Sequence, residues 1–146
     1  MSIQQSNPSR KPSIGDMNRI ELGKKLAAIR NGAEIDVEEL SAYAVQSIET
    51  GRSSYAVTNL FIYTDAIQCS VYVWDYNIDE HYRVGSVSDC HEVIEMLMRT
   101  RGFSTSDLNT RIGVRYTRPR DGQALLSIDT LLAILSFFHC SLQFSS

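Results

Sequence analysis

The stretch EELSAYAVQSIETGRSS, residues 38–54, decides how this chain is folded. It starts like a helix, with Leu40 and Ala44 four residues apart, and it ends in the Ile-Glu-x-Gly pattern of residues 48–51. Very little sequence lies between these two parts. A later segment of the chain follows the same order and is longer at this point, so the stretch marks where two related parts of the sequence differ.

The chain contains an internal repeat. LFIYTDAIQCSVYVWD (60–75) aligns without a gap with LLAILSFFHCSLQF (131–144), and this downstream alignment places Leu60 opposite Leu131. Nearer the N-terminus an upstream alignment places Leu26 opposite Ile94, and its offset is smaller by three. A repeat predicts two copies of one structural unit. The change of offset gives the second copy three extra residues near the opening stretch.

Each copy is expected to open with an amphipathic helix. In the first copy Leu22, Leu26 and Ile29 recur at helical spacing, and in the second copy Val93 and Leu97 do the same. Such a stripe buries one face of a helix and leaves the other face in water. We therefore expect both helices to pack on the core of the protein.

A second helix is expected to begin at Asp36 in the first copy and at Ser104 in the second. Both residues can cap a helix, and each is followed three positions later by an acid, Glu39 or Asp107. That arrangement satisfies the free amide groups at the start of a helix. In the first copy the predicted helix covers Asp36–Leu40.

Each copy is expected to end with an apolar helix and a short strand. Residues 60–67 and 131–138 carry apolar side chains at helical spacing, and the period then changes to two. The predicted strands are Ser70–Trp74 and Ser141–Phe144. An isolated strand leaves half of its backbone groups unpaired, so we expect these two strands to pair antiparallel with each other.

The sheet formed in this way would bury one of two sets of side chains, either Val71 and Val73 or Tyr72 and Trp74. In an alternative arrangement each strand pairs with the same strand of a second chain. That arrangement would make the protein a homodimer through its C-terminal strands.

Composition predicts a folded protein. The chain has 146 residues, of which 43% are hydrophobic, enough for one sizeable core or two small ones. No apolar run is long enough to span a bilayer, and the N-terminus lacks the apolar stretch of a signal peptide, so a cytoplasmic location is expected. Cys69, Cys90 and Cys140 lack paired C-x-x-C spacing, which favours buried reduced thiols over a metal site. We expect no metal and no cofactor.

Charge is distributed unevenly along the chain. The net charge is −3, but residues 1–30 hold six Lys and Arg against two acids, and residues 96–146 hold six Arg against three acids. Residues 31–95 hold two Arg against twelve acids. Two basic ends permit local contact with phosphate even on an acidic protein, although a solvated charge distribution without a partner explains them equally well.

The order of helices resembles the lambda-repressor-like, Xre-type helix-turn-helix family of bacterial and phage regulators. In the first copy the resemblance is carried by LGKKLAAIR (22–30), Asp36–Leu40, IETGRSS (48–54) and VTNLFIYTDAIQCSV (57–71). The second copy is similar in MRTRGFSTSDLNTRIGV (98–114) and LLSIDTLLAILSFFHCSL (125–142).

This resemblance implies a mainly α fold with two lambda-repressor-like helical units, each ending in a short β-strand, that together form a single-chain pseudo-dimer. The units would span residues 19–76 and 88–146, with a flexible tail at 1–18 and a linker at 77–87. It also implies a structural ion pair between Arg30 and Glu49, which would hold the first helix to the end of the motif. The second copy has Met98 and Arg120 at these positions.

The chain also departs from the family pattern. Family members place about six residues, including the first turn of the DNA-reading helix, where this chain runs directly from Val45 to Gln46. We therefore expect no more than about one turn of helix between Val45 and Thr50. The second copy keeps Ile112–Val114 but has Pro119 where helix would continue, so an extended segment or a hairpin turning at 119–122 is expected there.

The resemblance places the DNA-facing surface at these shortened segments. In the second unit an Arg-rich stretch with one aromatic residue suits phosphate and base contacts, and its alternative is a solvated basic loop. In the first unit the alternative is capping and turn chemistry. The candidate DNA-contacting residues are Arg111, Arg115, Tyr116, Thr117, Arg118, Arg120 and Gln123 in the second unit, and Gln46, Ser47, Arg52 and Ser53 in the first.

The function implied by the resemblance is a DNA-binding transcriptional regulator of bacterial or phage type, which contacts double-stranded DNA mainly through the Arg-rich segment of the second unit. The alternative is a degenerate repressor fold that acts as a protein-interaction module, like an antitoxin, without sequence-specific DNA binding. No nucleophile, base and orienting acid form a recognisable motif, so an enzyme is not expected.

Overall fold

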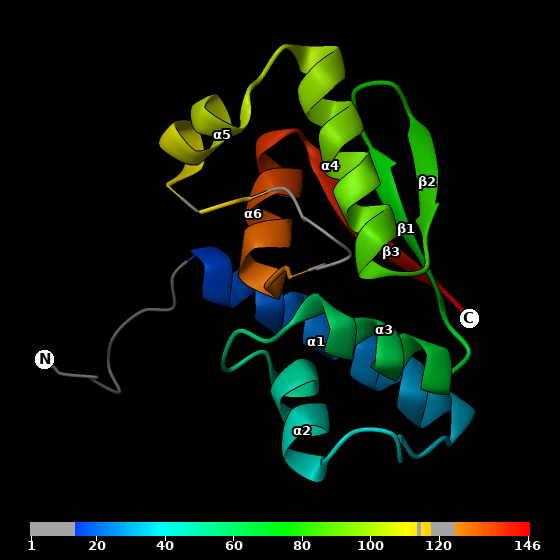
Figure 1. Cartoon of the computed structure of the whole chain (residues 1–146). Coiled ribbons are helices and arrows are strands. Elements are labelled where there is room, and N and C mark those ends of the chain that lie inside the picture. The colour runs from blue at the N-terminus through cyan, green and yellow to red at the C-terminus, as the bar shows by residue number, and fades with distance from the viewer. Residues whose placement is uncertain (1–13, 114, 118–124) are drawn as a thin grey trace, which may run out of the picture.

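The computed structural model describes residues 14–113, 115–117 and 125–146. Along the chain the elements are α1 (Ile14–Ala33), α2 (Ala42–Thr50), α3 (Val57–Ala66), β1 (Ser70–Asp75), β2 (Glu80–Val84), α4 (Val87–Arg101), α5 (Thr105–Ile112), α6 (Ile128–Phe137) and β3 (Cys140–Ser145). The protein is mainly helical with one small antiparallel sheet, as expected (Figure 1). No described helix combines the length and the apolar character that crossing a membrane requires.

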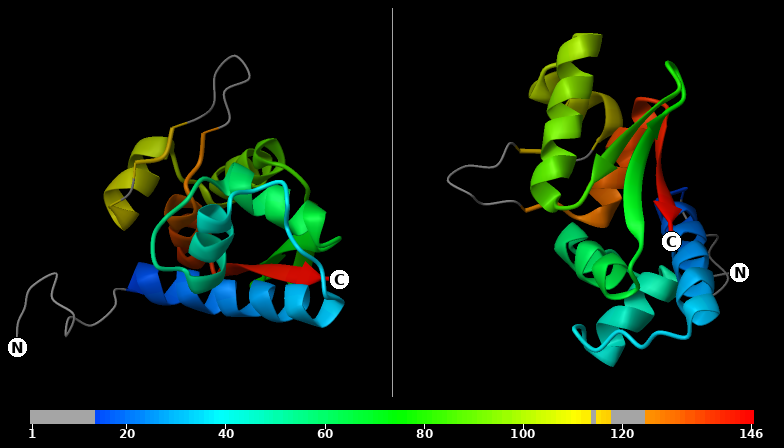
Figure 2. Two further views of the ribbon diagram at one scale, coloured as in Figure 1. Left: turned by 90° about the horizontal axis from the view of Figure 1, so that it is seen from below. Right: turned by 90° about the vertical axis from the view of Figure 1, so that its right-hand side faces the viewer.

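The sheet has three strands in the order β2-β1-β3. Strand β1 pairs antiparallel with β3 from Ser70 opposite Ser145 to Asp75 opposite Cys140, so the predicted pairing of the two strands is confirmed. Of the two sets of side chains considered, Val71 and Val73 are the buried ones. Helices α4 and α6 lie on one face of the sheet (Figure 2).

Pairing between β1 and β3 is reciprocal. Val71 lies opposite Phe144, and Val73 lies opposite Leu142. In the downstream alignment Val71 corresponds to Leu142 and Val73 corresponds to Phe144, so the two pairs are equivalent. Tyr72 lies opposite Gln143, which is its own counterpart in that alignment. Reciprocal contacts of this kind are the signature of a two-fold relation between paired surfaces.

A second reciprocal contact joins the segments that precede α3 and α6. Ala56 forms an isolated antiparallel bridge with Ser127, which again is its counterpart when the downstream alignment is extended to these residues. On either side, Val57 N–H donates to the Leu126 carbonyl at 2.9 Å and Ile128 N–H donates to the Tyr55 carbonyl at 2.8 Å. The chain therefore meets its own repeat at two separate places.

The helix ends also repeat. Ile35 N–H donates to the Arg30 carbonyl at the end of α1, and Phe103 N–H donates to the Met98 carbonyl at the end of α4. The turn before each paired strand contains a residue with positive φ, Gln68 at 58° and His139 at 59°. Buried side chains from both copies form one continuous core.

Three predictions about element boundaries are wrong. Helix α1 begins at Ile14, so residues 14–18 are helical and do not belong to a tail. The predicted linker 77–87 contains strand β2. Its Val84 is buried in the core and pairs with Val71, so this segment is part of the folded structure. No helix forms at Asp36–Leu40, where the chain is irregular.

The physical reason for the missing helix is the position of its apolar side chains. Ile35, Val37 and Leu40 are partly buried against the core, and they reach it from an irregular segment. The helix begins later, where Ser41 accepts a hydrogen bond from Ala44 N–H at 3.1 Å and caps α2. In the second copy the predicted helix is confirmed, because Ser104 and Asp107 form the expected capping box at the start of α5.

Helix α2 also overturns the expectation of only one turn between Val45 and Thr50. All six of these residues lie within α2. The difference in length between the copies lies in the connections: eight residues (34–41) precede α2 and three (102–104) precede α5, whereas six (51–56) follow α2 and fifteen (113–127) follow α5. A five-residue shortening and a nine-residue extension, together with a helix that is one residue shorter, give the net three extra residues.

Candidate nucleic-acid interface

Helix α2 is held against α1 by a close backbone approach. A Cβ atom on Gly23 would lie 2.5 Å from the carbonyl oxygen of Ile48 and would also meet the Glu49 backbone, so only glycine fits there. At the end of α2, Gly51 has a φ of +66° and its N–H donates to the Ser47 carbonyl at 3.0 Å. A left-handed residue at this position ends a helix and satisfies its last carbonyls, and glycine adopts it without strain.

The predicted ion pair holds the same end of α2. Arg30 Nη2 donates to Glu49 Oε1 at 3.0 Å, and Arg30 Nε and the Tyr63 hydroxyl both donate to Glu49 Oε2. The prediction of an Arg30–Glu49 ion pair is confirmed. Burial acts to raise the pKa of Glu49, but the hydrogen bonds from Arg30 and Tyr63 outweigh it and leave that pKa below its ordinary value.

These contacts fix which face of α2 is turned outwards. Ser47 and Ile48 are buried, whereas Tyr43, Gln46 and Thr50 are exposed. The three exposed residues are spaced three and four apart and so share one face of the helix. The expectation that Ser47 contacts DNA is therefore wrong, because its side chain is only 4% exposed.

Arg52 extends the exposed face of α2. Its guanidinium lies over the Tyr43 ring at 5.1 Å and donates to Gln46 Oε1 at 3.4 Å. An exposed arginine, an amide and an aromatic ring are groups that contact phosphates and base edges in nucleic-acid interfaces. Tyr43 was not among the predicted residues, although its spacing of three from Gln46 would have indicated it if α2 had been predicted.

Helix α5 carries Arg111 in its last turn. The Arg111 guanidinium lies 5.6 Å from the centre of the Phe103 ring and 5.7 Å from that of Phe137, and the residue is exposed. Stacking on two rings orients the side chain at the surface. Arg111 is therefore placed where a partner can reach it.

The chain after α5 turns alternate side chains to the surface and to the core. Arg115 and Thr117 are exposed, but Tyr116 between them is 1% exposed. The Tyr116 hydroxyl lies 2.8 Å from His91 Nδ1, and Asn109 binds the Tyr116 backbone through hydrogen bonds of 2.9 and 3.0 Å. The expectation that Tyr116 contacts DNA is corrected, because its side chain anchors this segment to α4.

The remaining candidates fall into two groups. Ser53 is half-buried next to Arg52. Arg118, Arg120, Gln123 and the hairpin predicted at 119–122 lie outside the described residues, so their placement stays a prediction. The bridge between Ala56 and Ser127 brings together the two connections that contain Arg52 and Arg115.

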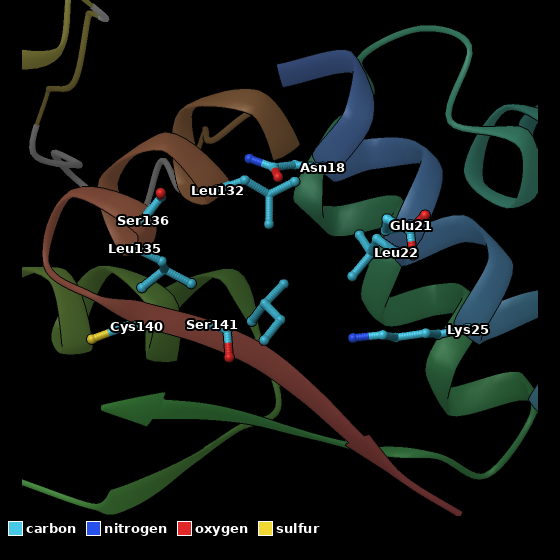
Figure 3. Close-up of a pocket in the computed structure, with 10 residues that line it drawn as sticks. Asn18, Glu21, Leu22, Lys25, Leu132, Leu135, Ser136, Cys140 and Ser141 are labelled. Atoms are coloured by element: carbon cyan, nitrogen blue, oxygen red, sulfur yellow. The ribbon is translucent and has the colours of Figure 1, made fainter. Parts of the chain in front are cut away.

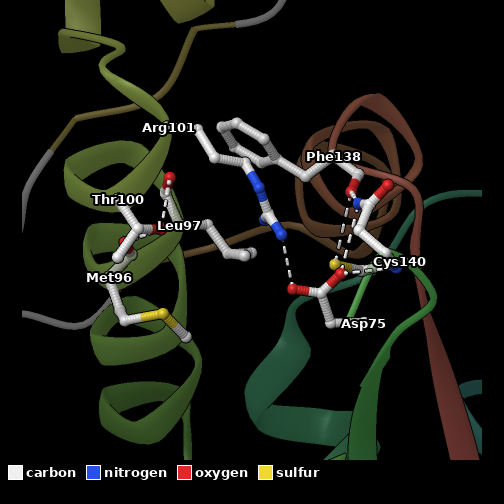
Figure 4. Close-up of polar contacts among 8 residues, drawn as sticks. Asp75, Met96, Leu97, Thr100, Arg101, Phe138 and Cys140 are labelled. Carbon is white, nitrogen blue, oxygen red and sulfur yellow. Dashed lines mark hydrogen bonds and ion pairs between the residues drawn. The ribbon is translucent and has the colours of Figure 1, made fainter. Parts of the chain in front are cut away.

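A second buried polar group ties α4 to the sheet (Figure 4). Asp75 is 1% exposed and accepts a hydrogen bond from Arg101 Nη2 at 2.6 Å and another from Asn77 N–H at 3.0 Å. Burial, together with the nearby Asp75 carboxylate, raises the pKa of the Cys140 thiol to about 11. A thiol of this kind is protonated at neutral pH and is a poor nucleophile, so the cluster has a structural role.

The cysteines are free and buried, as predicted. Among residues 14–113, 115–117 and 125–146, no three His, Cys, Asp or Glu side chains gather where they could hold a metal ion.

No protein-family model, curated protein or solved structure matches this chain. The relation to the Xre-type family therefore remains a proposal.

Proposed function

We propose that the chain is a DNA-binding transcriptional regulator of bacterial or phage type, built from two Xre-like units that act as a pseudo-dimer within one chain. It binds double-stranded DNA and catalyses no reaction. The observation that carries this proposal is the outward face of α2, where Arg52, which follows the helix, contacts both Tyr43 and Gln46. This helix ends in the Ile-Glu-x-Gly pattern that closes the DNA-reading helix in the family that the sequence resembles.

The pseudo-dimer is supported by the reciprocal contacts. The pairing of Tyr72 with Gln143 and the bridge between Ala56 and Ser127 both join residues that are counterparts in the downstream alignment. Two-fold symmetry of a protein dimer mirrors the symmetry of its DNA site. In this proposal α2 contributes one contact surface and Arg111, Arg115 and the Arg-rich segment after them contribute the other.

The alternative is a protein-interaction module without sequence-specific DNA binding. It is favoured by the acidic segment next to α2, where Asp36, Glu38 and Glu39 precede the cap residue Ser41. Three carboxylates beside the proposed contact face repel phosphate. The affinity of the protein for duplex DNA therefore distinguishes the two functions.

The test is a binding titration with a fluorescently labelled duplex of random sequence at several salt concentrations. We expect binding that weakens as salt rises, because contacts to phosphate release counterions. Replacing Arg115, Arg118 and Arg120 together with Ala is expected to lower the salt slope by about three, and Arg52→Ala by about one. Arg99→Ala, which removes an exposed cation at the end of α4, is the matched control and leaves the slope unchanged.

Two results would count against this proposal. Unchanged binding by both the triple variant and Arg52→Ala would move the interface elsewhere on the protein. If the wild-type protein does not bind duplex at low salt, the protein-interaction alternative replaces DNA binding.

A further inference from the structure

The two outer strands of the sheet differ in charge. Strand β2 carries the charged residues Glu80 and Arg83, whereas β3, with the sequence CSLQFS, has no charged residue. Edge strands in natural proteins commonly carry charges, which prevent pairing with other chains. Among the described residues no strand pairs with the outer edge of β3, and β3 itself supplies no charge to protect this edge.

The backbone groups that face this outer edge follow from the pairing. Tyr76 N–H donates to the His139 carbonyl at 3.1 Å, so position 139 is directed towards β1. Alternation along an antiparallel strand then turns the backbone groups of Cys140, Leu142 and Phe144 away from β1. Three N–H groups and three carbonyls are directed to the free edge.

The first half of the molecule shows what occupies the equivalent edge. There β2 pairs with the outer edge of β1, with Val84 buried opposite Val71. The N–H of Gly85, just after β2, donates to the Asp89 carboxylate of α4 at 2.7 Å. Strand β2 therefore occupies the outer edge of β1 and also contacts α4, the helix that opens the second copy.

In the second half the equivalent space is a groove. It measures about 240 Å³ and lies between α1 and the surface formed by α6 and β3 (Figure 3). Leu22, Leu135 and Leu142 give it an apolar lining, and Glu21 and Lys25 line it from α1. In the upstream alignment the counterparts of Glu21 and Lys25 are Asp89 and Val93, which lie beside β2.

We infer that the outer edge of β3 is a dimerisation site, at which β3 pairs antiparallel with β3 of a second copy of this chain. Each β3 would lie along the groove beside the other copy's α1 and would cover Leu22 and Leu142, which line that groove. This inference is independent of DNA binding.

A second copy is the occupant that the structure favours, for three reasons. Strands β1 and β3 are repeat counterparts that already pair antiparallel, so pairing of β3 with itself extends an arrangement that the molecule contains. The strand is uncharged, and self-pairing brings no like charges together. A two-fold contact closes on itself, whereas pairing of β3 with β2 of another copy would continue into a fibre.

The oligomeric state is measured by sedimentation velocity over a range of concentrations of the whole chain. Wild-type protein is expected to sediment as a dimer. Replacing Gln143 and Ser145 with Lys together is expected to shift it to the monomer, because both residues lie on the face of β3 opposite to the buried Leu142 and would place like charges across the new pair of strands. His81→Lys puts a charge on the same face at the other edge of the sheet and is the control that keeps the dimer.

Amide hydrogen exchange provides a measurement on the unmodified chain. In the dimer the amides of Cys140, Leu142 and Phe144 are protected, and the protection falls when the protein is diluted to the monomer. Circular dichroism shows whether the Lys variant keeps its fold.

Three outcomes would overturn the inference. One is a wild-type protein that is monomeric at all concentrations. This outcome overturns the inference even if the β3 edge of the monomer binds a strand of another protein. Another is a dimer that is unaffected by the two Lys residues. The third is exchange at Leu142 and Phe144 that does not change with concentration.

Discussion

The two halves of the molecule have the same order of elements but pack their second helix differently. In the first half α2 lies against α1, and Gly23 lets the two backbones approach closely. In the upstream alignment the second half has His91 in place of Gly23. The His91 side chain is hydrogen-bonded to Tyr116, whereas Gly23 contacts the backbone of helix α2. Helix α5 packs against α6. A repeat in the sequence therefore conveys the order of the elements, but single side chains decide which faces meet.

The polar contacts of the halves differ in the same way. Arg30, Glu49 and Tyr63 form a half-buried hydrogen-bonded group in the first half. The counterparts of Arg30 and Tyr63 are Met98 and Ile134, both of them buried. The counterpart of Glu49 is Arg120, so the second half has no carboxylate that would need Arg30 as its partner. Changing both members of an ion pair costs less than removing one, because no charge is left without its partner.

The largest effect is expected from adding a side chain at Gly23, where the backbones of α1 and α2 approach closely. Gly23→Ala should lower the free energy of unfolding by about 3 kcal/mol, because the new methyl group meets the α2 backbone and forces the helices apart. Chemical denaturation measures the change. Gly32→Ala is the matched control in the same helix: no atom lies within 4 Å of the added Cβ, and helix propensity should stabilise the protein by up to about 1 kcal/mol.

Equal stability of the Gly23→Ala and Gly32→Ala variants would show that α2 does not need its close approach to α1. The difference between the halves would then lie in the connections and not in this contact.

A smaller effect is expected from the ion pair. Arg30→Met, which copies Met98 of the second half, should cost about 2 kcal/mol, because it removes both hydrogen bonds that Arg30 donates to the half-buried Glu49 carboxylate and leaves only that of Tyr63. Glu49→Gln should cost a similar amount. The double variant should cost less than the two single changes added together, and a double-mutant cycle of unfolding free energies measures the difference. If the two single changes add strictly, the interaction between Arg30 and Glu49 contributes nothing to the free energy of unfolding.

The smallest effect concerns pH and belongs to the second half. Burial lowers the pKa of His91 below its ordinary value of 6.5, although Glu95 and the Leu125 carbonyl oppose the shift. The unfolded chain therefore binds a proton more readily than the folded one. The stability that depends on neutral His91 is complete above pH 6.5 and decreases as the pH falls below that value, by at most about 1.4 kcal/mol per pH unit.

Thermal unfolding at pH 7.5 and 5.5, values chosen to lie about one unit on either side of the ordinary histidine pKa, measures this dependence. His91→Gln should reduce it. A His91→Gln protein with the full wild-type pH dependence would place the titrating group elsewhere.

Much of the fold followed from the sequence because the signals were periodic. The helices that open and close each copy, the capping box at Ser104 and the pairing of the C-terminal strands were all predicted and are confirmed. The Arg30–Glu49 pair was also predicted, from the family resemblance, and is confirmed.

The errors arose where local and tertiary signals compete. Asp36 and Glu39 resemble the start of a helix, but packing of Val37 and Leu40 keeps the segment irregular and moves the helix start to Ser41. Strand β2 has only Tyr82 and Val84 as apolar residues, and it exists because β1 offers an edge to pair with. The burial of Tyr116 depends on His91, which is far away in the sequence, and no local pattern contains that information.

The position of β3 in the chain has a consequence for folding during synthesis. The central strand β1 is made long before β3, which is the last described element to leave the ribosome and supplies one of the two neighbours of β1. Arg19 in α1 likewise binds Asp129, which lies near the other end of the chain. We expect the β1–β2 hairpin and the packing of α1 on α2 to form on the nascent chain, while one edge of β1 stays open until β3 has been made and has left the ribosome. Nascent chains brought close together on one messenger could therefore exchange strands, so that each molecule completes its sheet with the β3 of its neighbour.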